Sequence, residues 1–481
     1  MDNHKLIQTL KTFSRKEWRE FSKYVESPYF NTDKHCIRLL EIFKKEFAKK
    51  DGFQLSRTRL EQLFSKDNTS LLNVKLSLLT RLVEGFLVQY NVESKDLYRK
   101  HLLLEELHQR GLSKHFERAY RKSASADDAP QKFSPEFYKN KMLVEHSFTK
   151  HITASKKKMG TRENLQEVID SLDIYYFLKK IDLFTDIMPI ENMYEKNYDN
   201  SAFELLETLI QTPRYANHPV LRVYYAAFQM IRFREDTSYY RKLWELLQTN
   251  GHLIEACSLY RLCSLCANYC VEKIIAGHTD FQQDMYEVYR KMEVEELFLL
   301  GECIDVGLLR NAVEIAIKIG ETEWAEYVLE KYKNKIAPDI RESVYMYCRS
   351  LFSFYQKKYG ETIGYLSNVG NIINTFDIGI KLMLMKAYYE SDEDFCYRTE
   401  QVFRSFKAFI KQRKGLAESR KEACINFTNI LMNLYRVKHG EGRRRLDAVT
   451  EKIEDYKLIT GRVWLTQKSE ELMLVRGSLA A

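Results

Sequence analysis

The sequence is poor in the two residues that most often interrupt regular structure, with seven prolines and 18 glycines among 481 residues. Architectures with many β-turns and long disordered tails both need more of these residues, so the composition argues against both. Long apolar runs are missing too, since none approaches the roughly 20 residues that span a bilayer. The opening segment MDNHKLIQTLKTFSRKEW lacks the apolar stretch of a secretory signal. We therefore expect a soluble, cytoplasmic protein without membrane insertion.

Cysteine and sequence motifs of catalysis are also scarce. The nine cysteines are odd in number, and five lie at least 28 residues from the next, which predicts free thiols in a reducing compartment. The chain has no G-x-x-x-x-G-K-[ST], G-x-S-x-G, H-E-x-x-H or paired C-x-x-C motif. The segment HGEGRRR at 439–445 follows no strand, so we interpret it as a turn between helices with exposed arginines. We predict no enzyme activity, no catalytic residues, no metal and no cofactor.

The positive charge is unevenly distributed along the chain. Residues 1–125 hold 25 Lys or Arg against 16 Asp or Glu, whereas the remainder holds 50 against 51. The net charge of +8 therefore comes from the N-terminal quarter. Such a surplus can mark a surface for nucleic acid or for an acidic partner, but interspersed charges of both signs are also typical of a solvated face.

The N-terminal quarter shows helical patterning. In FSRKEW, Ser14 and Glu17 have the spacing of a capping box, and Phe13 and Trp18 have that of a hydrophobic staple. Helices are expected at 15–26, 33–50, 56–64, 70–91 and 95–122. The helix at 70–91 is apolar around most of its circumference, which predicts a central position in its domain. The segment SASADDAPQ then interrupts the periodicity, so we predict a basic N-terminal helical domain at 1–122 and a linker at 123–133.

The rest of the chain, 134–481, continues as helix after helix. Ser134 can cap a helix that starts with Pro135, and Phe133 and Tyr138 have the spacing of a second staple. Glycine or proline residues provide the expected interruptions, at positions 160, 189, 213, 219, 251, 277, 320, 338, 360, 415 and 440. No alternating strand pattern occurs. We predict an all-α fold in which helical hairpins stack as an α-solenoid after the N-terminal helical domain.

The region from about 305 to 410 resembles tetratricopeptide (TPR) repeats. In RNAVEIAIKIGETEWAEYVLEKY, a turn glycine at Gly320 precedes the small Ala325 and the large Leu329, and Pro338 closes the unit. Thr362 and Leu366 repeat this pattern 37 residues later, close to the 34-residue TPR period. A third unit follows 35 residues on and departs from the pattern, with Tyr397 and Gln401 at the small and large positions, while Lys357 replaces the turn glycine of the second. Looser hairpins are expected at 165–210, 219–247 and 252–292. The N-terminal segment FSRKEWREFSKYVESPYFN is similar to uncharacterised helical-repeat proteins.

The densest group of potential ligands is CSLYRLCSLCANYC, with four cysteines between 257 and 270. On a helix, Cys263, Cys266 and Cys270 lie in one apolar stripe. The whole stripe consists of Ala256, Leu259, Cys263, Cys266, Cys270 and Ile274. At about 1.5 Å per residue, Cys263 and Cys270 are roughly 10 Å apart, too far to share one tetrahedral ion. We interpret the stripe as helix core and not as a metal or redox site.

The histidines His101, His108 and His115 recur every seven residues. Glu105 and His108 form the E-x-x-H of di-iron helix bundles, but that chemistry needs a second such motif, and none occurs. Successive histidines are again roughly 10 Å apart along a helix. We interpret them as partly exposed residues of a helix face.

These observations favour a non-catalytic scaffold or adaptor that binds a protein or peptide on the concave surface of the solenoid, with partner-binding residues unknown. The alternative is a DNA-binding regulator, because LSRTRLEQLF followed by SLLNVKLSLLTRLVEGFLV has the outline of a helix-turn-helix head joined to a TPR-like sensor region. A recognition helix should present basic and polar residues to the DNA groove. The second helix instead is mostly apolar, with Arg81 beside Glu84.

Overall fold

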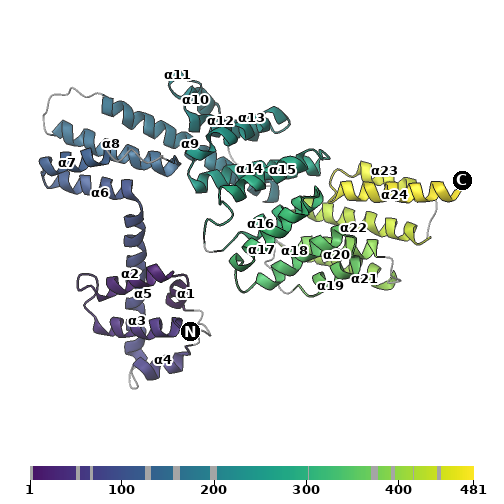
Figure 1. Ribbon diagram of the computed structural model, residues 1–481, viewed down its shortest axis with the longest axis horizontal. Coiled ribbons are helices and arrows are strands. Elements are labelled where there is room, and N and C mark those ends of the chain that lie inside the picture. Colours follow the sequence, from purple (N-terminus) through teal and green to yellow (C-terminus); the bar gives the residue numbers. More distant parts are fainter. Residues whose placement is uncertain are drawn as a thin grey trace. The chain divides into compact units, whose positions relative to one another are not determined.

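The computed structural model describes residues 4–49, 55–64, 69–124, 132–154, 163–194, 203–301, 303–369, 377–391, 396–414, 416–440 and 446–480. In these ranges the chain forms 24 α-helices and two short 3₁₀ helices. One isolated β-bridge joins Phe133 to Ile254, and no strand occurs in the described ranges. The prediction of an all-α fold is confirmed (Figure 1).

The chain divides into two compact units. The first comprises Met1–Ala129 and Lys139–Leu172, and the second comprises Pro130–Tyr138 and Asp173–Ala481. The 34 residues of Lys139–Leu172, which the sequence placed with the repeat region, therefore belong to the first unit. Residues 125–131, most of the expected linker, lie outside the described ranges.

The first unit begins with four helices that pack against α5. This helix, Thr69–Ser94, contacts all four preceding helices, α1 (Lys5–Lys11), α2 (Arg15–Glu26), α3 (Lys34–Phe47) and α4 (Arg57–Phe64). Most of the apolar face expected from the sequence is buried to 3% exposure or less, namely Leu72, Leu76, Leu79, Val83 and Phe86. The predicted central position of this helix is confirmed.

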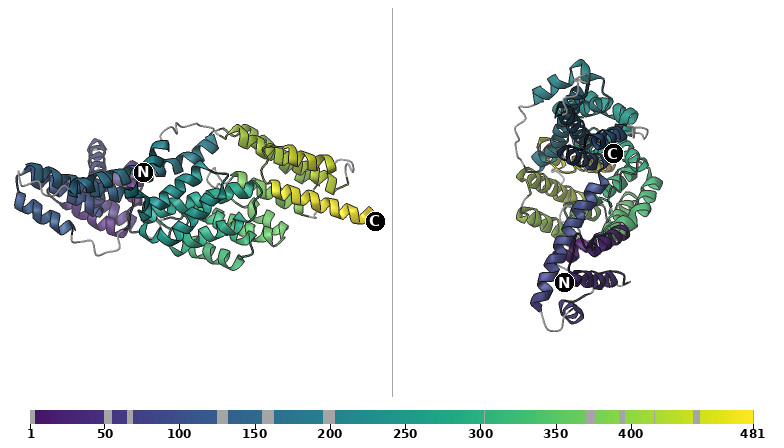
Figure 2. Two further views of the ribbon diagram at one scale, coloured as in Figure 1. Left: turned by 90° about the horizontal axis from the view of Figure 1, so that it is seen from above. Right: turned by 90° about the vertical axis from the view of Figure 1, so that its left-hand side faces the viewer.

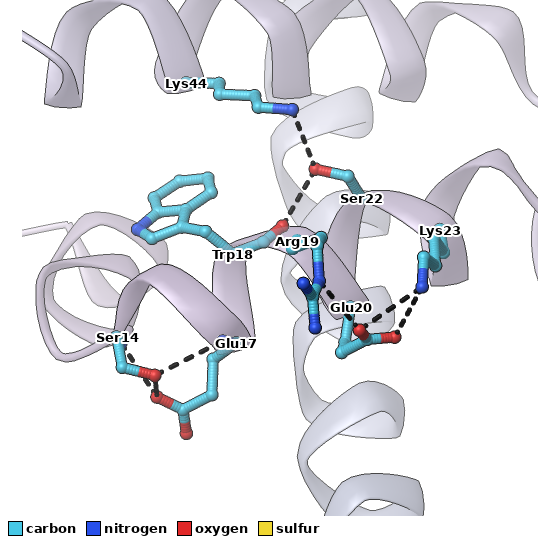
Figure 3. Close-up of polar contacts among 8 residues, drawn as sticks. All are labelled: Ser14, Glu17, Trp18, Arg19, Glu20, Ser22, Lys23 and Lys44. Atoms are coloured by element: carbon cyan, nitrogen blue, oxygen red, sulfur yellow. Dashed lines mark hydrogen bonds and ion pairs between the residues drawn. The ribbon is translucent and has the colours of Figure 1, made fainter.

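The start of α2 has the predicted capping geometry (Figure 3). Ser14 Oγ accepts a hydrogen bond from the Glu17 backbone N–H at 3.2 Å, and the Glu17 carboxylate accepts one from the Ser14 N–H at 2.8 Å. The rings of Phe13 and Trp18 meet edge to face with centroids 5.8 Å apart, which completes the hydrophobic staple. Ser22 then donates to the Trp18 carbonyl at 2.8 Å, and Lys44 of α3 approaches Ser22 Oγ at 3.5 Å.

The prediction of one long helix at 95–122 is wrong. The structure has two helices, α6 (Asp96–Gln109) and α7 (Ser113–Ala124), which pack against each other. Gly111 lies between them with φ of +69°, a left-handed conformation that glycine adopts without steric strain. The helix α8 (Pro135–Ala154) from Lys139 onward and the first residues of α9 (Glu163–Tyr194) complete this unit, around a small core that contains Leu104, Phe116 and Val144.

The second unit consists mainly of consecutive helical hairpins, shown in Figures 1 and 2. The second helix of each early hairpin packs on the first, as contacts between α12 and α13, α14 and α15, α16 and α17, and α18 and α19 show. One large core cluster runs from Tyr138 to Ala387, and a second from Ile378 to Leu465. The helices are α10 (Phe203–Ile210), α11 (Pro213–Ala216), α12 (Pro219–Arg232), α13 (Thr237–Asn250), α14 (Ala256–Ile275), α15 (Phe281–Val294), α16 (Val306–Lys318), α17 (Thr322–Tyr332), α18 (Arg341–Tyr355), α19 (Tyr359–Ser367), α20 (Asp377–Glu390), α21 (Cys396–Gln412), α22 (Glu418–Lys438), α23 (Leu446–Asp455) and α24 (Arg462–Ala480).

The positions that carried the repeat pattern behave differently in successive hairpins. Ala325 and Leu329 of α17 are both fully buried, and Gly320 has φ of +92° in the preceding turn. Thr362 of α19 is also fully buried, and its hydroxyl lies 2.9 Å from that of Ser353. In α21, by contrast, Gln401 is exposed and the buried residue is Phe403, so the third unit departs from the pattern as its sequence indicated.

One helix continues through a position where an interruption was expected. The expected interruption at position 189 is wrong, because α9 continues from Glu163 to Tyr194 through that position. A proline removes one backbone hydrogen bond, and a helix can continue past it with a bend.

No helix in the described part of the chain is both long enough and apolar enough to cross a membrane.

Candidate functional site

The cysteine-rich segment forms the buried side of α14. Cys263, Cys266 and Cys270 are fully buried, whereas Cys257 is exposed. Burial raises the pKa of both the Cys263 and the Cys270 thiol to about 12, so both are neutral. Cys270 Sγ donates to the hydroxyl of Tyr240 on α13 at 3.3 Å. The stripe is helix core, as predicted.

The histidine row is divided between two helices, because the turn at Gly111 separates His115 on α7 from the two histidines on α6. His101 is 8% exposed, and its Nδ1 lies 3.0 Å from Ser147 Oγ on α8. His108 Nδ1 lies 3.2 Å from His151 Nδ1, also on α8. His115 is exposed. The prediction of partly exposed residues on one face is wrong for His101, which is buried between helices.

Among the residues that the structure describes, no three His, Cys, Asp or Glu side chains lie together so that they could hold a metal ion. In the segment HGEGRRR, residues 441–445 lie outside the described ranges. Gly440 follows His439, the C-cap residue of α22, and has φ of +90°.

The second unit contains a groove between α14 and α16, the first helices of two successive hairpins. We name it the α14–α16 groove; its volume is about 300 Å³. One wall is mainly apolar and includes Ile275, which is 67% exposed, while the opposite wall is polar and charged. The lining residues are Asn268, Val271, Ile274 and Ile275 of α14, Gln282 and Met285 of α15, and Arg310, Asn311, Glu314, Ile315 and Lys318 of α16.

The charged wall of this groove is built on an ion pair. Glu314 and Lys318 are one turn apart on α16, and their charged atoms are 2.8 Å apart. Burial by itself lowers the pKa of Lys318, but the Glu314 carboxylate outweighs it and raises the pKa above its ordinary value. Burial likewise favours the neutral form of Glu314, yet Lys318 and Arg310 lower the pKa of this carboxyl. Both groups are therefore ionised at neutral pH.

Lys386 of α20 lies close enough to Lys318 to be affected by its charge. Burial and this like charge lower the pKa of Lys386 from 10.5 to about 8. Its Nζ lies 5.1 Å from the ring centroid of Trp464 on α24, a cation–π contact. Within the described part of the chain, Lys386 forms no hydrogen bond or ion pair.

A larger groove, of about 540 Å³, lies on the helices α17, α18 and α19. We name it the α17–α19 groove. Arg349 of α18 binds the Glu326 carboxylate at 2.7 Å and donates to the Tyr345 hydroxyl at 3.1 Å. The lining residues are Thr322, Glu323, Glu326 and Tyr327 of α17, Arg349, Phe352, Ser353 and Gln356 of α18, and Glu361 and Tyr365 of α19.

No protein-family model, curated protein or solved structure matches this chain. The grooves and the fold are thus the basis for a functional proposal.

Sequence reasoning did not find either groove. The helical periodicity identifies residues that face the core, but a groove depends on how far apart two neighbouring helices lie at their exposed edges. Ile275 gives a partial indication of the α14–α16 groove, because it is an apolar residue at the end of α14 that lies outside the buried cysteine stripe.

Proposed function

We propose that this protein is a non-catalytic, cytoplasmic scaffold whose hairpin stack is a TPR-like α-solenoid, and that a segment of a partner protein binds in the α14–α16 groove. The observation that carries the proposal is the pairing of an exposed apolar wall with an ionised wall across one groove. Apolar contact supplies affinity, while charged groups select the partner and its orientation. Stacked hairpins provide such grooves on elements that are held rigid by a common core.

The apolar wall has the properties of an interface. Ile275 is 67% exposed, and Met285, which also lines the groove, is an adaptable side chain that can pack against different partners. The charged wall already has its ion pair, Glu314 with Lys318, so a partner with matching polar groups can bind without leaving either charge unpaired.

Contacts in the first unit favour this function over DNA binding. Arg57 forms an ion pair with Glu61 at 3.1 Å and donates to Asn73 on α5 at 2.6 Å. Two charged residues of α5 itself are also paired, Lys75 with Asp33 of α3 and Glu84 with Lys5 of α1. Because α5 packs against four helices and these charges are paired, Arg81 is the one cation of this helix that is exposed without an ion pair in the described ranges, which is little for a DNA groove.

The proposal is tested by affinity purification of the full chain from its native host, with and without nuclease. An Ile275→Glu variant introduces a charge on the apolar wall, and Val294→Glu is its matched control, because Val294 is 70% exposed and also ends a helix, α15. We expect a specific partner to co-purify with the wild type and with Val294→Glu, to survive nuclease, and to be lost with Ile275→Glu.

Two results would count against the proposal. Retention of the same partners by Ile275→Glu would show that the α14–α16 groove does not bind them. Loss of all co-purifying material on nuclease treatment would instead favour the DNA-binding alternative.

A further inference from the structure

The α17–α19 groove combines aromatic rings with carboxylates. Tyr327 and Tyr365 stand on its two outer helices and are 50% and 37% exposed. Three of its lining residues are glutamates, Glu323, Glu326 and Glu361, and Arg349 is its single cation. The groove is therefore negatively charged, in a chain whose net charge is +8.

Arg349 shows how these groups hold a cation. Its guanidinium binds the Glu326 carboxylate at 2.7 Å and approaches that of Glu330 at 3.7 Å. It also lies 5.3 Å from the ring centroid of Tyr345 and 5.6 Å from that of Phe352. Carboxylates and ring faces together are the groups that bind an ammonium or guanidinium strongly.

A second set of the same groups lies in this groove without a cation. Glu323 of α17 and Glu361 and Tyr365 of α19 are all exposed. Within the described ranges, neither of these two carboxylates forms an ion pair, and no cation lies over the Tyr365 ring. Since Arg349 is already engaged by Glu326, it does not neutralise them.

We propose that the α17–α19 groove binds a lysine- or arginine-rich segment of a partner protein, with Glu323, Glu361 and Tyr365 as the residues that hold its cationic side chain. The charge of the groove favours this occupant over an acidic or purely apolar segment. A volume of about 540 Å³ accommodates several side chains, as an extended segment requires. The site is separate from the α14–α16 groove and does not depend on what binds there.

The test uses the full chain and a fluorescein-labelled peptide of alternating lysine and alanine, with fluorescence anisotropy at about 150 mM salt. The variant Glu323→Gln with Glu361→Gln removes both charges and keeps the size of both side chains. Its control is Glu342→Gln with Glu422→Gln, which changes the net charge equally at two exposed positions outside the groove. Tyr365→Leu removes the ring face and leaves the charges unchanged.

We expect the groove variant to weaken peptide binding about tenfold, because two charge-assisted contacts are lost. Tyr365→Leu should weaken it about threefold, and the control should bind as the wild type does. The matching peptide of alternating glutamate and alanine should not bind.

Three outcomes would overturn the proposal. These are equal weakening by the groove variant and its control, no binding of the basic peptide up to about 1 mM, and self-association of the wild type, measured by sedimentation, that the groove variant abolishes. The last result would identify a second copy of this chain as the occupant. None of these outcomes bears on the Ile275 test.

Discussion

Two helices of this protein carry potentially reactive side chains at the same spacing and use them in opposite ways. On α14, Cys263 and Cys270 are seven residues apart, and on α6 His101 and His108 are also seven residues apart. The cysteines are fully buried in the large core of the second unit. The histidines meet polar partners on α8, Ser147 and His151.

The difference arises from what each side chain needs when it is buried. A thiol packs as a small hydrophobe, and burial keeps it protonated by raising its pKa. An imidazole has a donor and an acceptor that lose water on burial, so the neighbouring helix must supply a hydrogen-bonding partner. Spacing therefore sets the face on which a residue lies, whereas its chemistry sets what the facing helix must offer.

The largest loss of stability is expected when a charge is placed in the cysteine stripe. Cys266→Asp buries a carboxylate where the native side chain is fully buried among apolar residues, so we expect a loss of at least about 4 kcal/mol in the free energy of unfolding of the second unit. The control Cys257→Asp makes the same change at an exposed position of α14 and should cost less than about 0.5 kcal/mol. Urea unfolding followed by far-UV circular dichroism measures both. Similar stabilities for the two variants would contradict the assignment of this stripe to the core.

Lys386 sharpens the comparison, because it is a charged residue of the second unit that forms no ion pair within the described part of the chain. Its pKa of about 8 means that the folded protein binds this proton less tightly than the unfolded chain, where the value is about 10.5. The cost of the buried charge is complete below about pH 8 and disappears as the pH rises towards about 10.5, because only the folded state loses the proton in that window. We expect Lys386→Met to stabilise the protein at pH 7 by up to about 3 kcal/mol.

The advantage of Lys386→Met over the wild type should shrink between pH 8 and pH 10, as measured by urea unfolding across that range. Lys411→Met, at an exposed lysine of α21, controls for the loss of one positive charge. An advantage that stays constant across the range would show that lost charge repulsion elsewhere, and not deprotonation of Lys386, explains the effect.

The sequence predicted well what depends on neighbours along the chain. The capping box at Ser14, the face of α5 and the cysteine stripe all follow from spacing, and all three are present. The prediction of a single helix at 95–122 was wrong because the helical periodicity continues on both sides of Gly111. The turn at this residue is visible in its backbone conformation.

The two grooves could not be predicted for a related reason. Glu323 and Glu361 are 38 residues apart and stand on different hairpins, so their common surface depends on tertiary packing. The partners of His101 and His108 lie more than 40 residues away on α8, and nothing in the spacing of the histidines indicates them.

The smallest effect concerns the polar contact between α6 and α8. Ser147 Oγ lies 3.0 Å from both the Leu143 carbonyl oxygen and the Nδ1 atom of His101, and the latter contact joins α8 to α6. Ser147→Ala leaves the buried Nδ1 atom of His101 without this hydrogen-bonding partner and should cost about 1–2 kcal/mol. The double variant His101→Leu with Ser147→Ala replaces both polar groups by apolar ones and so converts the contact into the type found around the cysteines of α14.

We expect the double variant to recover about 1 kcal/mol relative to the sum of the two single changes, because removing both partners leaves no buried group unsatisfied. Thr149→Ala is the control on the same helix, since the Thr149 hydroxyl donates to the Glu145 carbonyl of its own helix, and this change should show no coupling to His101→Leu. Urea unfolding of the wild type, single and double variants gives the coupling energy. Strict additivity of the two changes would mean that the His101–Ser147 contact does not stabilise the packing of α6 on α8, and the contrast with α14 would then rest on burial alone.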